Sequence, residues 1–237
     1  KYCCIFSLLL LSLIFNKIFL NSSSFLAPNE TPSFTNSATS LYLDKRMQTE
    51  GLLKIAPSGN FLYTANLNGY ISIYAVNPKT GILTAIKDSP FHIQKKISGM
   101  AFDPTGKFAL TTDYLHNSII SYSINDETGR LTKIKETPIK SGKNPNSITI
   151  DPTGRFALVY KRDSFNLSTF NINTKTGVLT GIKGSSFIAG RLIGLVFALT
   201  GKFVYALRYE AIDAYYFDPT VGKLTDIING GYDGFSD

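Results

Sequence analysis

The sequence predicts an all-β protein made of β-propeller blades, each a four-stranded antiparallel sheet. Two turn motifs recur along the chain with nearly the same period, and short segments of alternating apolar residues lie between them. No unit contains the run of about ten helical residues that a crossover helix would need. Four strands repeated every 40–50 residues or so are typical of a propeller blade.

The composition supports this fold class. The chain has 237 residues, of which 43% are hydrophobic and 17% are charged, as in an ordinary globular protein. A lone four-stranded sheet would leave two apolar faces exposed, whereas stacking neighbouring sheets face to face buries them. We therefore expect the alternating Ile, Val, Phe and Tyr positions to form the core.

Both motifs occur four times. The first is a turn that ends in Gly-x-Phe, and it occupies residues 56–61, 103–108, 151–156 and 198–203. The second is Gly-x-Leu-Thr, and it begins at Gly81, Gly129, Gly177 and Gly222. Successive glycines of the first motif lie 47, 48 and 47 residues apart. The chain thus divides into four repeats, at about 51–97, 98–145, 146–192 and 193–230.

The third repeat illustrates the predicted elements in order. Its expected strands are residues 147–150, 156–161, 167–172 and 178–182, and its turns are 151–154, 163–166 and 173–177. In the first of these turns proline fixes φ and glycine accepts a positive φ. Asp103 and Asp151 precede the proline of such turns, and we expect their carboxylates to cap them by Asx-type bonding rather than to bind a metal.

The first forty residues are predicted to be separate from the blades. Residues 5–20 are almost wholly apolar and follow Lys1, which predicts a signal peptide or an N-terminal anchor over 1–20. Residues 21–40 are rich in Ser, Thr, Asn and Pro and predict a flexible linker to blades at 41–237. We therefore expect an extracytoplasmic protein (secreted, periplasmic or on the cell surface). It would touch a membrane only through the apolar segment, if that segment is not cleaved.

Charge and motifs exclude several functions. The net charge is +7, but the basic residues are spread singly without interleaved stacking aromatics, so we expect no nucleic-acid partner. The two cysteines, Cys3 and Cys4, precede the apolar segment and predict neither a disulfide framework nor a Cys-ligated metal. Neither a phosphate-binding loop nor a serine nucleophile elbow occurs, and we expect no cofactor and no metal.

The repeat resembles the lactonase-type seven-bladed propeller family, which includes 6-phosphogluconolactonase-like proteins and surface proteins with a Tyr-Val-Thr-Asn repeat. The resemblance lies in Asp-Pro-Thr-Gly-Lys/Arg-Phe, in Thr-Gly-x-Leu-Thr and in the third strand Ile71–Asn77, while Tyr63–Asn66 matches the tetrapeptide in part. It implies a seven-bladed ring, and this chain holds four repeats and begins with Lys1. We expect a piece of a longer protein; closure with four blades or association of chains are the alternatives. Residues 41–50 are a candidate outer strand that would close the ring.

The resemblance also implies a Pro-Arg-His sequence at the start of an innermost strand. The matching places are residues 97–99, 145–147 and 192–194, and none contains His or Arg. The chain has only His92, which follows Pro90-Phe91 in an expected inter-blade loop, and His116, in the expected Leu115-His116-Asn117 turn, and we expect both to be loop residues. No acid at a suggestive spacing would orient either of them, although a propeller site can draw an acid from another blade. The catalytic residues therefore remain unassigned.

Candidate binding residues lie where the predicted second strands end and before the innermost strands. We expect these ends on one rim of the propeller, either as a binding surface or as solvated loops. The residues are Asn66, Asp113, Tyr114, Asn146, Lys161, Arg191 and Arg208. The sequence thus predicts an exported lactonase-like propeller that binds an unknown protein or small molecule through its rim or channel. The alternative is a lactone hydrolase with part of its site outside this chain.

Overall fold

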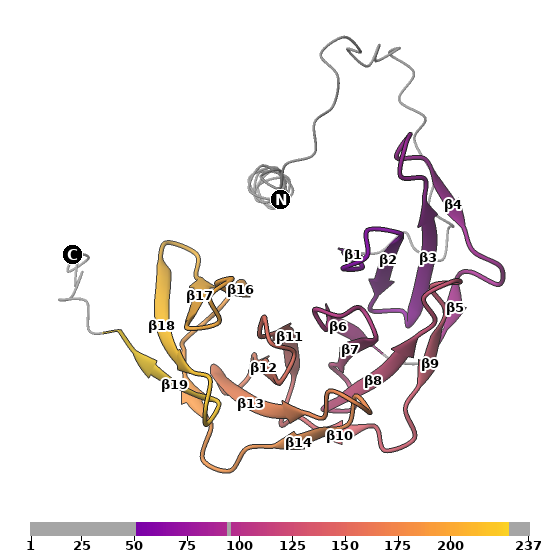
Figure 1. Ribbon diagram of the computed structural model, residues 1–237. Coiled ribbons are helices and arrows are strands. Elements are labelled where there is room, and N and C mark those ends of the chain that lie inside the picture. The colour runs from indigo at the N-terminus through magenta and orange to yellow at the C-terminus, as the bar shows by residue number, and fades with distance from the viewer. Residues whose placement is uncertain (1–50, 94–95, 228–237) are drawn as a thin grey trace, which may run out of the picture. The chain divides into compact units, whose positions relative to one another are not determined.

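The computed structural model describes residues 51–93 and 96–227, and this part of the chain forms four antiparallel β-sheets (Figure 1). The predicted all-β fold with four propeller blades is confirmed. Within the described ranges no helix is long and apolar enough to span a membrane. The predictions for residues 1–20, 21–40 and 41–50 lie outside the described residues.

Each sheet is formed by one repeat. The first sheet contains β1 (Gly51–Ile55), β2 (Phe61–Asn66), β3 (Tyr70–Val76), β4 (Leu83–Ala85) and β5 (Phe91–His92). The second contains β6 (Ile97–Phe102), β7 (Phe108–Asp113), β8 (Ser118–Ile124), β9 (Leu131–Lys133) and β10 (Ile139–Lys140). The third contains β11 (Pro145–Ile150), β12 (Phe156–Lys161), β13 (Asn166–Ile172), β14 (Leu179–Gly181) and β15 (Phe187–Ile188). The fourth contains β16 (Gly194–Phe197), β17 (Phe203–Leu207), β18 (Ile212–Asp218) and β19 (Lys223–Asp226).

Three short strands were not predicted: β5, β10 and β15. Each pairs with the third strand of its own sheet, as Tyr70 pairs with His92 in the first sheet. The third strand is seven residues long and the fourth only three, so the beginning of the third strand has an open edge. The chain pairs with this edge on its way to the next sheet, which satisfies backbone groups that would otherwise lack partners.

Apolar clusters join each sheet to the next. In one cluster Tyr63 and Ile73 of the first sheet pack with Met100 of the second. Similar clusters join Leu110 to Val159, and Leu158 to Val204. Residues on alternate positions of each second strand thus face opposite neighbours, as the period of a strand requires.

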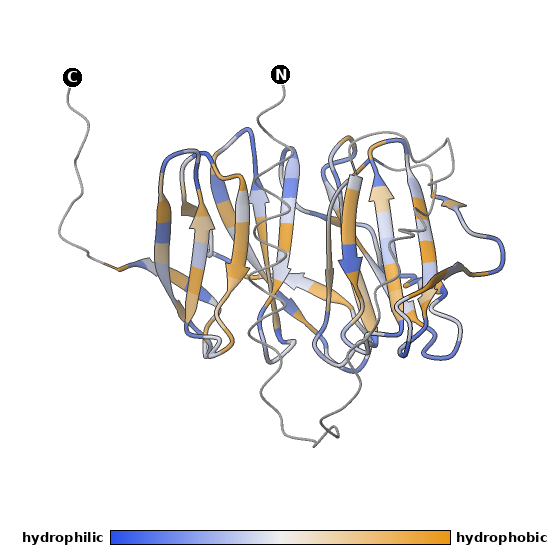
Figure 2. Ribbon diagram, turned by 90° about the horizontal axis from the view of Figure 1, so that it is seen from above, coloured by the Kyte–Doolittle hydropathy of each residue, from blue (hydrophilic) through white to orange (hydrophobic). Residues whose placement is uncertain are grey.

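The strands run between two rims of turns, with apolar residues along the strands (Figure 2). One rim holds the turns from second to third strands and the connections that lead into β6, β11 and β16; we call it the entry rim. The register places the end of each second strand beside the start of the inner strand, as in Ile97–Asp113 and Pro145–Lys161. The Gly-x-Phe and Gly-x-Leu-Thr turns lie on the opposite rim.

Candidate functional site

The candidate residues lie on the entry rim, in four equivalent places. Asn66, Asp113 and Lys161 are the last residues of β2, β7 and β12, and Arg208 directly follows β17. Each sheet thus presents one polar side chain of different chemistry at the same position: an amide, a carboxylate, an ammonium and a guanidinium.

Asn66 has a structural role. Its side chain is fully buried, and its Oδ1 accepts hydrogen bonds from the backbone N–H groups of Asn68 (3.1 Å) and Tyr70 (3.0 Å). These bonds hold the turn between β2 and β3. Asn66 therefore caps the turn that follows its strand. Asp113, Lys161 and Arg208 occupy the equivalent position in the other three sheets.

Asp113 caps the equivalent turn and also binds a histidine. Its Oδ1 accepts from the N–H groups of Leu115 and His116, both at 3.2 Å. Its Oδ2 lies 2.8 Å from Nδ1 of His116. The side chain of Asp113 is 1% exposed and that of His116 is 49% exposed. A buried carboxylate therefore orients an accessible imidazole, and the acid comes from the turn of His116 itself, which the spacing had not suggested.

Sequence reasoning found no acid at a suggestive spacing and therefore did not pair His116 with Asp113. The turn brings a side chain at i+3 back over the end of β7, where Asp113 already accepts the N–H of His116. Since a carboxylate can only accept, Nδ1 is the protonated nitrogen of the neutral ring, and Nε2 carries the lone pair on its far edge.

The residues next to His116 fix the turn to its surroundings. Tyr114 is half-buried, and its N–H donates to the carbonyl of Lys96 at 2.9 Å. The carbonyl of Asn117 accepts from the N–H of Ser141 (2.9 Å), and its Oδ1 accepts from the N–H of Asn144 (2.8 Å). The histidine turn of the second sheet is thus bonded to both flanking connections.

Lys161 lies on the far side of the 141–144 connection. Its side chain is aligned along Gly142, where a Cβ would come within 2.7 Å of Lys161 Cδ. Its Nζ donates to Oγ of Ser168 at 2.7 Å. Burial lowers the pKa of this ammonium. Asn146 is half-buried in β11, where the register shifts between Pro145 and Ser147.

Arg208 and Arg191 form a separate group at the fourth sheet. Arg208 is paired with Asp213, with Nε 3.0 Å from Oδ2, and Tyr215 also donates to that carboxylate at 3.1 Å. The exposed Arg191 guanidinium lies over the ring of Tyr209, 5.4 Å from its centroid. The structure therefore links Asp113, His116 and Lys161 through one connection, whereas Arg208 contacts Asp213 and Arg191 contacts Tyr209.

The remaining histidine has a different setting. The ring of His92 stacks on that of Tyr70, with centroids 4.5 Å apart and 24° between the planes. In the described part of the chain no group of three His, Cys, Asp or Glu side chains could hold a metal ion.

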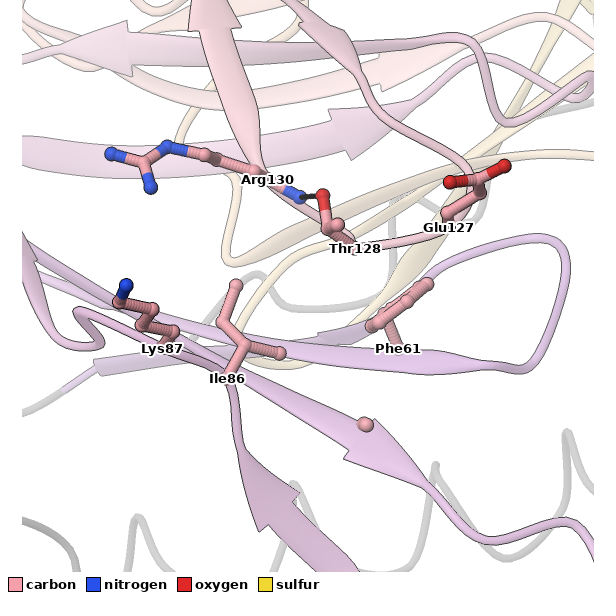
Figure 3. Close-up of a pocket in the computed structure, with 7 residues that line it drawn as sticks. Phe61, Ile86, Lys87, Glu127, Thr128 and Arg130 are labelled. Carbon is pink, nitrogen blue, oxygen red and sulfur yellow. Dashed lines mark hydrogen bonds between the residues drawn. The ribbon is translucent and has the colours of Figure 1, made fainter.

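A groove of about 390 Å³ lies between the first and second sheets (Figure 3). Phe61 and Ile86 form one wall, and Glu127 and Thr128 form the other (Figure 3). Ala75, Lys87 and Arg130 complete the lining. Arg130 is engaged within the protein, 3.3 Å from Asp88 and above the ring of Phe91. The groove lacks a histidine, and no sequence motif pointed to it.

Four-stranded blades stacked through their faces define a β-propeller protein. A model of the lactonase family, described as a seven-bladed β-propeller, matches residues 55–190. The match covers more than half of the chain, and the chain belongs to this family. A search of curated protein sequences finds no match.

Several solved structures share the fold. A candidate 6-phosphogluconolactonase from Bacteroides uniformis is 20% identical, with a TM-score of 0.65 over 74% of this chain and 52% of its own. One from Bacteroides fragilis is 22% identical, with a TM-score of 0.63 over 78% and 56%. The periplasmic gluconolactonase of Pseudomonas aeruginosa is 19% identical, with a TM-score of 0.61 over 73% and 51%. The chain thus spans about half the length of these structures.

Proposed function

We propose that this chain carries part of a lactone-hydrolysing site on its entry rim, with His116 as the general base. The observation that carries the proposal is the 2.8 Å contact between Asp113 Oδ2 and His116 Nδ1, made by a His116 side chain that is 49% exposed. Nε2, the nitrogen that this contact does not use, would then take up the proton of a water molecule. Membership of the lactonase family and the likeness to gluconolactonase structures support the reaction class.

The proposed reaction follows from the ring's two nitrogens. Nε2 of His116 takes a proton from water while the water oxygen bonds to the lactone carbonyl carbon, and the carbonyl oxygen becomes an oxyanion. When the oxyanion collapses, the bond between that carbon and the ring oxygen breaks, and the ring oxygen takes the proton back from Nε2. The product is the open-chain hydroxy acid. The Asp113 carboxylate stabilises the transient imidazolium and keeps the ring in place.

Basic side chains of the same rim would stabilise the oxyanion and the acid product. Lys161 lies along Gly142, in the connection that is hydrogen-bonded to the His116 turn. The carbonyl of Lys96 accepts a hydrogen bond from Tyr114 N–H in the same turn. Positive groups aimed at developing negative charge are the usual complement of a general base in acyl transfer.

The test is lactone turnover by the natural full-length protein, measured as acid release from gluconolactone and its 6-phosphate. We expect His116→Gln to lower kcat/KM by about 10²- to 10⁴-fold, the usual contribution of a general base. The matched control is His92→Gln, which changes the other histidine of the same rim and should leave turnover unaltered. Turnover that survives His116→Gln, or a wild-type protein that turns over neither lactone, would overturn the proposal.

A binding propeller without catalysis is the second candidate. It is favoured by the starts of β6, β11 and β16, where Ser98, Asn146 and Gly194 stand near the positions of the family's Arg-His sequence. In that case the rim holds a ligand or a protein, and export through residues 1–20 would place it outside the cytoplasm. Calorimetric binding of a lactone or sugar acid without turnover would support this candidate.

A further inference from the structure

The turns of the entry rim share a feature that the proposed hydrolysis does not use. Each turn between a second and a third strand presents one large apolar side chain to solvent. These are Leu67, Leu115, Phe165 and Tyr209, which are 41%, 56%, 44% and 70% exposed. Exposing an apolar side chain of this size in four equivalent turns forgoes the stabilisation that burial would give.

In the second and third sheets, the exposed large apolar side chains all lie on the entry rim. Both sheets are flanked by neighbours on their two faces, so their exposed side chains do not arise from an uncovered face. Their exposed large apolar residues are Leu115, Phe165 and Ile188, and all three lie on the entry rim. On the opposite rim, the turns 103–107, 125–130, 151–155 and 173–178 of the same two sheets expose none.

Basic side chains surround the apolar tips. In the described part of the entry rim, the exposed basic side chains are Lys96, Lys140, Lys143, Arg162 and Arg191, together with Arg208, which is paired with Asp213. The exposed acidic side chains in the same described part are Asp163 and Glu210, and Asp113 is buried. The rim therefore combines separate apolar tips with an excess of positive charge.

We propose that the entry rim docks on an anionic phospholipid surface. The apolar tips belong to different sheets, one on each, and polar residues such as His116 and Arg162 stand between them. A protein partner would need a complementary pocket for each tip, and its hot spots would cluster at the centre of the interface. A lipid surface accepts each tip separately, and anionic headgroups attract the neighbouring Lys and Arg side chains.

The chain contains no tryptophan, so a single introduced tryptophan reports the surroundings of one turn. The test uses the full chain with Leu115→Trp and vesicles of phosphatidylcholine and phosphatidylserine. We expect a blue shift of the emission and quenching by lipids with brominated acyl chains, both weaker at high salt and with phosphatidylcholine alone. The matched control is Ile82→Trp, at a 63% exposed site on the opposite rim, whose emission should not change.

A second pair of variants tests the charge. Lys143→Glu with Arg162→Glu should weaken vesicle binding by about tenfold or more, since each basic residue near an anionic surface contributes appreciably. Lys107→Glu with Lys202→Glu, on the opposite rim, should leave binding unchanged. An unaltered emission of Leu115→Trp in anionic vesicles would assign the apolar tips to a protein partner and overturn the lipid proposal. An equal shift at position 82 would overturn it as well.

Discussion

The ring of Phe61 packs directly over the Cα of Gly129 in the next sheet, where a Cβ would lie 2.5 Å from Cδ1 of the ring. The same relationship joins Phe108 to Gly177, and Phe156 to Gly222. The two turn motifs of the repeat are therefore halves of one contact. The phenylalanine of each of the first three sheets needs a glycine in the following sheet, which explains why both motifs recur with nearly the same period.

Replacing Gly129 by alanine should destabilise the protein more than the same change at Gly81. Both glycines have a positive φ, 69° and 70°, so both substitutions incur the same backbone strain. Only Gly129 faces a ring; the structure has nothing within 4 Å of a Cβ at Gly81. We expect the free energies of unfolding of the two variants to differ by about 1–3 kcal/mol, the usual cost of overpacking. Urea unfolding measures this difference, and equal losses would contradict the contact.

The fold was predictable from the sequence because its determinants are local and repeated. The turn residues, the alternation along Leu167–Ile172 and the spacing of the glycines each report on a few neighbouring residues. The two-residue strands such as β5 were not predictable, because Phe91 and His92 pair with Tyr70 and Ile71 only where β4 has already ended. That depends on the relative lengths of strands, which no motif records.

The site was less predictable because the side chains at equivalent positions have different tasks. The repeat alone places four side chains at equivalent positions of the rim: Asn66, Asp113, Lys161 and Arg208. It does not predict which groups each of these side chains contacts. Asn66 caps its turn, whereas Asp113 caps a turn and also holds His116. The function of such a residue depends on a turn of three or four residues, and turn geometry follows from tertiary contacts as much as from sequence.

The equivalence with Asn66 suggests a variant that separates the two tasks of Asp113. In Asp113→Asn the amide oxygen can still accept from the N–H groups of Leu115 and His116, as Asn66 does in its own turn. We expect a loss of less than about 1 kcal/mol in stability, within the range of a neutral hydrogen-bond exchange. The variant should nevertheless lower kcat by about tenfold or more while KM changes little, because His116 loses its orienting carboxylate.

A spectroscopic readout distinguishes this positioning effect from simple damage to the turn. In the natural protein the carboxylate holds the proton on Nδ1 of His116, and nitrogen NMR of the imidazole should show one dominant tautomer. Asp113→Asn should give a mixture of tautomers with an unchanged backbone spectrum. An unchanged tautomer would show that Asp113 acts only as a cap.

The stability of the protein should fall at alkaline pH partly through Tyr122. Burial raises the pKa of this phenol to about 12 from its usual value of 10.0. Between these values the unfolded chain loses the phenolic proton and the folded protein keeps it, so the free energy of unfolding decreases as pH rises, by at most about 1.4 kcal/mol per unit for one group. Tyr122→Phe should reduce this slope between pH 10 and 11 when urea unfolding is followed at each pH. An equal slope in Tyr122→Phe and the natural protein would contradict the assignment.

The turns of the opposite rim carry their own test of side-chain capping. Asp151 Oδ1 accepts from the N–H of Phe156 at 2.7 Å, and Oδ2 accepts from the N–H of Thr153 at 3.0 Å, which agrees with the expected Asx-type bonding. In the fourth sheet Ala198 stands at this position, and its turn has the same backbone bonds, from Ala198 N to Phe203 O and from Gly201 N to Ala198 O.

The backbone turn thus forms without the carboxylate. The carboxylate's contribution to stability can therefore be removed in the third sheet and introduced in the fourth. We expect Asp151→Ala to cost about 1–3 kcal/mol, because it leaves the buried N–H of Phe156 without its acceptor. Ala198→Asp should stabilise the fourth sheet, by about 0.5–1.5 kcal/mol, because it supplies acceptors to the N–H groups of Thr200 and Phe203. Hydrogen exchange at the Phe156 and Phe203 amides reports each effect locally: exchange should accelerate in the first variant and slow in the second. If Ala198→Asp left the Phe203 amide unchanged, the cap would depend on the proline that follows Asp151 and that Leu199 replaces in the fourth sheet.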